Sequence, residues 1–251
     1  MKTKLLNSLM LAALVAPGVA LAEEASPHTF SANVGIFSDY MYRGISQTGT
    51  GAALQGGMDY AHASGFYAGV WGSNISWLSD AAVATSASVE LDTYFGFRNS
   101  FAEDFTYDVG FLRYNYPGTY VAGATKADTD EIYGSVGYKW VSAKYSYSLG
   151  DTFGWAGADG SAYLEINASY AIEDTGISLG AHMGKQTFKG AAVAGLPVDY
   201  TDYKVSVSKD FNGYVFGLAY TDTNANRVAY TNPQGKYLGQ GTAVLSLTHA
   251  F

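Results

Sequence analysis

The sequence predicts an all-β protein, a transmembrane antiparallel β-barrel of about twelve strands (about 10–14 possible), with short periplasmic turns and longer external loops. Three observations predict this fold. Segments of roughly ten residues alternate apolar and polar side chains with a period of two. The connections between these segments alternate between short and long. The composition, with 30 glycines, 21 tyrosines and only 14% charged residues, describes many strands and turns and little helix.

The first 22 residues are expected to be an export signal. Lys2 and Lys4 provide a positively charged start, and the stretch from residue 5 to 15 is apolar and uncharged. Ala20 and Ala22 are small residues at the positions that a signal peptidase recognises, so cleavage leaves Glu23 first. The alternative is a membrane anchor, but the apolar stretch is short for a bilayer. The predicted organisation is a signal peptide over 1–22 and one barrel domain over 23–251.

Charge and cysteine content exclude several classes of protein. Loss of the two signal-peptide lysines changes the formal charge from −8 to −10. An acidic chain with few clustered bases argues against nucleic acid as a partner. There is no cysteine, so neither a disulfide nor a cysteine-held metal stabilises the fold. This is ordinary for a closed barrel, in which no strand edge is free. No cofactor is expected.

The alternation itself places particular side chains on particular faces. In the segment 86–98, Val89 and Leu91 share one face, and Glu90 and Asp92 share the other. The polar faces carry mostly Gly, Ser, Asn and Tyr, which suits a crowded, wet lumen better than the water-facing side of a soluble sandwich. The predicted strands lie near 29–43, 52–60, 66–73, 86–98, 105–114, 130–140, 141–149, 162–172, 177–185, 200–208, 214–222 and 242–251.

The connections support this topology. Short links lie near 62–65, 99–104, 140–143, 173–176 and 209–213, and longer Gly-, Ala-, Thr- and Asp-rich loops lie near 44–51, 74–85, 115–129, 150–161, 186–199 and 223–241. Short turns at one end and long loops at the other are typical of bacterial outer-membrane barrels. We therefore expect the protein in the outer membrane of a Gram-negative bacterium, in contact with lipid and lipopolysaccharide.

The last strand has the pattern of a sorting signal. Leu245, Leu247, His249 and Phe251 share its outward face, and the chain ends on an aromatic residue. This pattern resembles the signal that the barrel assembly machinery of the outer membrane recognises. His249 stands where an apolar residue is more usual. Aromatic side chains expected to face outward near strand ends would suit the headgroup level of the bilayer; they are Tyr40, Tyr42, Trp140, Tyr214, Tyr220 and Phe251.

Three further runs carry a family resemblance. They are Ser38–Thr48 (SDYMYRGISQT), Gln55–Tyr60 (QGGMDY) and Gly65–Asn74 (GFYAGVWGSN). In this order they resemble the opening blocks of the TorF family, densely over 38–77 and by pattern over the rest. That family is described as porins without settled solutes or a map of functional residues. The resemblance implies a porin and carries over no functional residue.

Strand parity predicts which side chains line the lumen. Asp39 and Arg43 are expected to point inward near the outer end of the first strand, where they could hold the first loop, narrow the mouth or form a purely structural ion pair. The predicted pore-lining residues are Asp39, Arg43, Gln55, Asp59, Glu90, Asp92, Arg98, Asp108, Glu131, Lys139, Lys144, Glu165, His182, Asp202 and Lys204.

These residues include more carboxylates than bases, and twelve strands give a bore between a filled eight-stranded barrel and a general porin. The function expected is passive diffusion of small hydrophilic solutes with a weak bias toward cations. One alternative is a plugged, non-conducting barrel with a structural or surface-binding role. Another is a lipid hydrolase using His62 and Ser64, whose spacing also suits a turn. No metal motif and no catalytic residue is predicted otherwise. A homo-oligomer is compatible with the outward faces.

Overall fold

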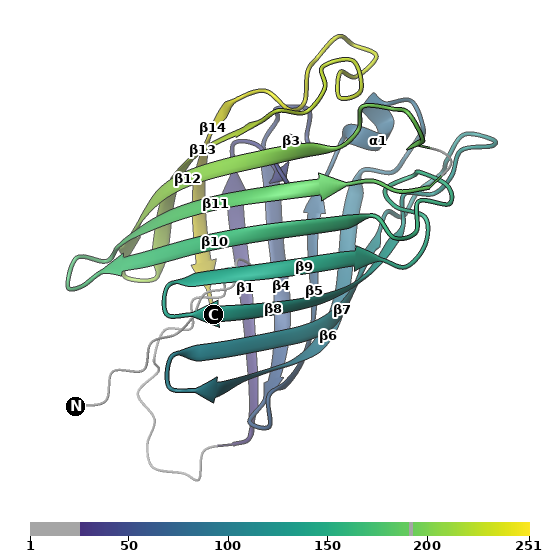
Figure 1. Ribbon diagram of the computed structural model, residues 1–251. Coiled ribbons are helices and arrows are strands. Elements are labelled where there is room, and N and C mark those ends of the chain that lie inside the picture. Colours follow the sequence, from purple (N-terminus) through teal and green to yellow (C-terminus); the bar gives the residue numbers. More distant parts are fainter. Residues whose placement is uncertain (1–25, 191–192) are drawn as a thin grey trace.

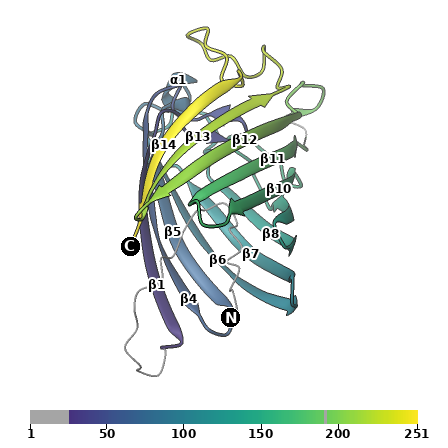
Figure 2. The ribbon, with the colours of Figure 1, turned by 90° about the vertical axis from the view of Figure 1, so that its left-hand side faces the viewer.

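The computed structural model describes residues 26–190 and 193–251, and its strands close into one antiparallel barrel. Figures 1 and 2 show the wall from two sides. β1 pairs with β14 on one side and with β4 on the other, so the wall has no edge strand. The predicted fold and the number of twelve wall strands are confirmed. The predicted signal peptide, residues 1–22, lies outside the described residues.

The wall strands in chain order are β1 (His28–Phe37), β4 (Ala53–His62), β5 (Phe66–Asn74), β6 (Val89–Ala102), β7 (Phe105–Asn115), β8 (Thr129–Tyr138), β9 (Val141–Ser148), β10 (Ala162–Ile172), β11 (Ile177–Thr187), β12 (Tyr200–Phe211), β13 (Tyr214–Thr223) and β14 (Thr242–Ala250). Two short strands outside the wall, β2 (Met41–Tyr42) and β3 (Ile45–Ser46), form a hairpin, and α1 spans Trp77–Asp80. No helix in the described part of the chain is long and apolar enough to cross a membrane.

The period of two determines which side chains face outward. On β6, Val89 and Leu91 are 44% and 45% exposed, whereas the alternating Glu90 and Asp92 are 1% and 7% exposed. The same alternation places large apolar side chains of every wall strand on the outer surface. The polar faces therefore all point into the barrel.

Tyrosine rings inside the barrel lie against glycines of neighbouring strands. Gly96 is paired with Tyr67, and a Cβ at Gly96 would clash with the Tyr67 hydroxyl oxygen. Gly69 stands in the same relation to Tyr94, whose ring carbons would lie 2.5 Å from a Cβ. Any side chain at these two glycines would displace a ring, so the glycines make room for the tyrosines that fill the lumen.

The ends of the barrel differ. Short turns join β4–β5, β6–β7, β8–β9, β10–β11 and β12–β13, and the longer connections gather at the other end together with α1 (Figure 2). A long loop also joins β1 to β4, and it contains the β2–β3 hairpin. We call residues 38–52, which leave the wall after β1 and return to it at β4, the lumen hairpin.

Two predictions about the first part of the chain are wrong. The first strand ends at Phe37 and not at residue 43. Tyr40 and Tyr42 therefore do not face outward, and the Tyr40 ring is 8% exposed inside the barrel. The alternation of Tyr40, Tyr42 and their neighbours belongs to the hairpin, which has the period of a strand without belonging to the wall.

The predicted position of Lys139 in the lumen is also wrong. It lies in the two-residue turn between β8 and β9, with φ of 53°, and its Nζ is 3.6 Å from Asp104 Oδ2 in the neighbouring turn. Its side chain is 47% exposed at the rim. Parity counted along the strand fails there because a residue with left-handed φ reverses the chain.

Candidate functional site

The barrel interior gathers nearly all the residues that parity predicted. Asp39 and Arg43 lie inside it on the lumen hairpin, and Lys139 lies outside it in the turn. The predicted residues on inward faces of wall strands are Gln55, Asp59, Glu90, Asp92, Arg98, Asp108, Glu131, Lys144, Glu165, His182, Asp202 and Lys204. That they line a path for solutes is a prediction about function.

Arg43, at the tip of the lumen hairpin, reaches across the bore. Its Nη1 and Nη2 donate to Glu131 Oε1 and Oε2 on β8 at 3.1 and 2.8 Å, and Nη1 also donates to Gln186 Oε1 on β11 at 2.8 Å. The Arg43 and Glu131 side chains are 7% and 1% exposed. Because β8 lies nearly opposite the junction of β1 and β4 in the wall order, this bidentate pair holds the hairpin across the lumen.

The tip also packs closely against the wall. Gly44 has φ of 76°, and a Cβ there would lie 2.6 Å from the Asp202 Cβ and 2.5 Å from the Thr223 Cγ2. The guanidinium of Arg43 lies 4.3 Å from the ring centre of Tyr163 and 4.9 Å from that of Tyr42. Glycine at this tip permits both the left-handed backbone and the close contact with β12 and β13.

Asp39 holds the base of the hairpin. Its Oδ1 accepts hydrogen bonds from the Ser46 hydroxyl at 2.7 Å and the Thr48 hydroxyl at 2.9 Å. Burial raises the pKa of Asp39, and these two hydrogen bonds oppose that effect. Asp39 and Arg43 do not form the ion pair that their shared parity allowed, because each is bonded to a different partner.

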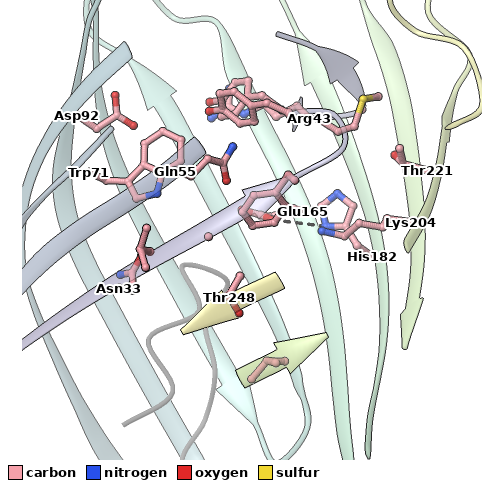
Figure 3. A pocket seen from close by; sticks show the side chains of 18 of the residues that line it. Asn33, Arg43, Gln55, Trp71, Asp92, Glu165, His182, Lys204, Thr221 and Thr248 are labelled. Carbon is pink, nitrogen blue, oxygen red and sulfur yellow. Dashed lines mark ion pairs between the residues drawn. The ribbon is translucent and has the colours of Figure 1, made fainter. Parts of the chain in front are cut away.

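Cavities lie on both sides of the lumen hairpin. One, of about 660 Å³, is lined by inward residues of the wall including Asp92, Glu165 and His182 (Figure 3). The other, of about 480 Å³, lies among the long loops and is lined by aromatic residues such as Trp77 and Tyr230. Tyr42 lines both. The hairpin lies between these two cavities. We call the first the polar chamber, after the charged side chains in its lining, and the second the aromatic vestibule.

A hydrogen-bonded cluster occupies one wall of the polar chamber. His182 Nε2 lies 2.9 Å from Asp202 Oδ1, and His182 Nδ1 lies 2.7 Å from Asn167 Oδ1. The Asn167 amide donates to Glu165 Oε2 at 2.9 Å, so its oxygen faces the imidazole. Tyr163 donates to Asp202 Oδ2 at 2.8 Å. Both ring nitrogens of His182 therefore face oxygen atoms of neighbouring inward side chains.

The facing wall carries the carboxylates of β6. Tyr40 of the hairpin donates to Glu90 Oε1 at 3.2 Å, and Glu90 Oε2 has no partner. Asp92 lines the polar chamber, whereas Glu90 is withdrawn behind the hairpin and is not among the lining residues. The two side chains share the inward face as parity predicted, but they differ in their access to the chamber.

Nearer the turns, tyrosines fill the bore. Tyr67 donates to Asp108 Oδ1 at 2.7 Å and its hydroxyl contacts that of Tyr133. Arg98 and Lys144 lie over aromatic rings, at 4.8 Å from the Tyr67 centre and 4.3 Å from the Tyr133 centre. These contacts join the inward faces of β5 to β9 in one layer of tyrosines and charged side chains.

Sequence reasoning missed several residues of this interior, above all Tyr67, Tyr133, Tyr163 and Gln186. All four have inward parity on wall strands. For the tyrosines a signal exists, because Gly96 and Gly110 stand opposite Tyr67 and Tyr133 in the register. Nothing local marks Gln186, whose partner Arg43 is 143 residues away.

The turn that contains His62 and Ser64 lies at the rim. The Ser64 hydroxyl is 2.8 Å from His62 Nδ1, and the Ser64 backbone N–H donates to the same nitrogen at 3.1 Å. That second bond is typical of a turn and occupies the nitrogen that would activate the serine. In the part of the chain that the structure describes, no group of three or more potential ligands could hold a metal ion.

A family model described as "Bacterial protein of unknown function (Gcw_chp)" matches residues 21–251. No curated protein matches the chain.

Several solved structures are similar. A chain from the study "Unveiling the Mechanism Behind the in-meso Crystallization of Membrane Proteins" has 8% identity and a TM-score of 0.49, with 88% of this chain and 83% of that chain covered. The TodX deltaS2S3 mutant monoaromatic hydrocarbon channel has 11% identity and a TM-score of 0.46, with 90% of each covered. Acinetobacter baumannii OccAB3 has 12% identity and a TM-score of 0.45, with 92% of this chain and 66% of OccAB3 covered.

Proposed function

We propose that this chain, which belongs to the Gcw_chp family of bacterial proteins of unknown function, is an outer-membrane channel. It would allow passive diffusion of small hydrophilic solutes, with a weak preference for cations. The observation that carries this proposal is a polar chamber of about 660 Å³ inside a closed barrel whose outer surface is apolar. The resemblance of residues 38–77 to the TorF family of porins agrees with a channel. Membership of that family is part of the proposal.

The outer surface supports a membrane location. Ile36, Leu54 and Val205 are 58%, 59% and 60% exposed on separate strands, and each points away from the lumen. Soluble proteins rarely expose apolar side chains all around their surface. Lipid would cover them, while the closed ladder satisfies the backbone within the bilayer. Export through residues 1–22 with a mature start at Glu23 is part of the proposal.

The C-terminus supports assembly into the outer membrane. Phe251 is 75% exposed on the outer surface, and its backbone exchanges hydrogen bonds with Ala32 of β1 at 2.8 and 3.3 Å. His249 lies 4.5 Å from the Tyr214 ring centre and 4.7 Å from that of Phe251. This stacking accounts for a histidine on an outward face. We propose the barrel assembly machinery as the partner of this strand, and lipid and lipopolysaccharide around the wall.

The charge of the lumen supports a cation preference. Without Lys139, the predicted interior set holds eight carboxylates and four basic side chains. Arg43 is neutralised by Glu131 at 2.8 Å, so it does not act as a free positive charge in the bore. A net negative lining raises the local concentration of cations and repels anions.

One observation favours a second candidate function, a plugged barrel. The lumen hairpin crosses the bore, and its Arg43–Glu131 pair is almost fully buried. If the hairpin never leaves this position, the barrel does not conduct and has a structural or surface-binding role.

Single-channel recording in planar bilayers tests both. The channel proposal expects discrete current steps in KCl from the purified, folded protein. In a KCl gradient it expects a reversal potential of the sign that cation preference requires. Insertion of the folded protein without any conductance would overturn the channel and support the plugged barrel.

A further inference from the structure

Asp92 is a buried carboxylate that the barrel leaves without a hydrogen-bond partner. The residue is 7% exposed on the inward face of β6, it lines the polar chamber, and its Oδ1 is shielded from water without any partner in the described residues. Figure 3 shows Asp92 beside Trp71 and Gln55, on the opposite side of the chamber from Glu165, His182 and Lys204. Asp92 thus borders the chamber, and one of its two carboxylate oxygens is buried in the wall without a partner.

Among the described residues, no ion pair includes Asp92. Burial and the neighbouring carboxylates of Glu90 and Glu131 act against its ionisation. Glu131 is paired with Arg43, and Glu90 accepts a hydrogen bond from Tyr40. Burial without a partner disfavours the ionised carboxyl, so a positive group placed against Asp92 would stabilise its carboxylate form.

Aromatic rings surround the same carboxylate. Trp71 on β5 and Tyr114 on β7 are the direct cross-strand neighbours of Asp92 in the register. Tyr40 of the hairpin lies edge-on to Trp71, with 5.5 Å between ring centres. All three rings line the chamber together with Asp92. Aromatic faces attract positive charge, and an aromatic group with one carboxylate is the arrangement that binds organic ammonium groups.

A small metal ion fits this arrangement less well. Calcium and magnesium require several oxygen ligands, and the described residues hold no group of three or more potential metal ligands. Across the chamber, His182 already lies against Asp202 at 2.9 Å, and Lys144 lies over the Tyr133 ring. A chamber of about 660 Å³ has the size of a small-molecule site.

We propose that Asp92, Trp71, Tyr114 and Tyr40 form a binding site inside the lumen for a small organic ammonium compound. This inference rests on the proposed channel and deepens it, because it names the chemical class of the solute. The carboxylate contacts the ammonium charge, and the rings contact the alkyl groups around it.

The test is calorimetric titration of the purified, folded protein in detergent with tetramethylammonium chloride, at constant ionic strength. We expect saturable binding that Asp92→Asn weakens by about tenfold or more, since a charge-assisted contact is lost. Trp71→Leu, which keeps the carboxylate, is expected to weaken it severalfold. Asp130→Asn is the matched control, since Asp130 is a carboxylate bonded to Arg113 on the outward face of β8 and does not line the chamber. It should leave the affinity unchanged.

Any of three results would overturn the proposal: no binding to the wild-type protein, equal affinity for wild type and Asp92→Asn, or equal loss in Asp130→Asn and Asp92→Asn. Gel mobility before and after boiling verifies folding of each variant. If Asp92→Asn does not fold, the comparison of Trp71→Leu with wild type decides, because unchanged affinity there would refute the aromatic site. Binding in detergent does not require conduction. Binding without current in bilayers would refute the channel and leave the site standing, whereas current without binding would do the reverse.

Discussion

Replacement of Arg43 by alanine should open the lumen. In the closed arrangement the guanidinium makes two hydrogen bonds to Glu131 and one to Gln186, and both charged side chains are less than a tenth exposed. Removing one partner of a buried ion pair costs about 3–5 kcal/mol, because the other charge is left uncompensated. Since water can enter the chamber when the hairpin moves, we take the lower value of about 3 kcal/mol.

This magnitude sets the expected change in gating. With about 1.4 kcal/mol for each factor of ten, the ratio of closed to open hairpin falls by about a hundredfold. Single-channel recording measures this as a longer open time or a larger mean conductance. Arg43→Lys should be intermediate, because lysine keeps the charge and loses the planar fork that matches the carboxylate.

Arg113→Ala is the matched control. Arg113 also donates two hydrogen bonds to a carboxylate, at 3.0 and 2.9 Å to Asp130, but it lies on the outward face of the wall and is 41% exposed. Its loss removes the same kind of contact from a surface pair, which contributes little. If Arg43→Ala folds and conducts no more than wild type, or if Arg113→Ala opens the channel equally, the hairpin is not held by Arg43.

Three further predictions concern export, assembly and selectivity. The protein should fractionate with the outer membrane, begin at Glu23, and migrate faster on gels before boiling than after; recovery as a soluble periplasmic protein without a mobility shift would contradict the barrel in the membrane. Deletion of Phe251 removes both backbone hydrogen bonds to Ala32 at the seam, so unassembled protein should accumulate, and insertion at the normal level would show that this residue is no sorting signal. Glu90→Gln combined with Asp92→Asn should lower cation preference at low salt, where screening is weakest, and an unchanged reversal potential in a conducting variant would exclude these carboxylates as determinants.

The strands and their faces could be predicted because their cause is local. A period of two follows from the backbone of a single strand, so Glu90 and Asp92 can be placed on one face without knowledge of any neighbouring strand. The prediction was wrong for Tyr40 and Tyr42. These residues alternate like those of a wall strand, but they belong to a hairpin inside the lumen.

The sequence by itself thus determined the barrel, its strand number to within two, and most of the charged side chains directed inward. Only the tertiary structure decided how those side chains divide the interior. Arg43 is separated from Glu131 by 88 positions in the sequence and from Gln186 by 143. These partners become neighbours only when the wall closes. Closure also decides that Glu90 is covered by Tyr40 while Asp92 faces the chamber, because the covering ring comes from a loop 50 residues away. Period and parity are properties of one strand, whereas a chamber and its free carboxylate are properties of twelve strands and the hairpin between them.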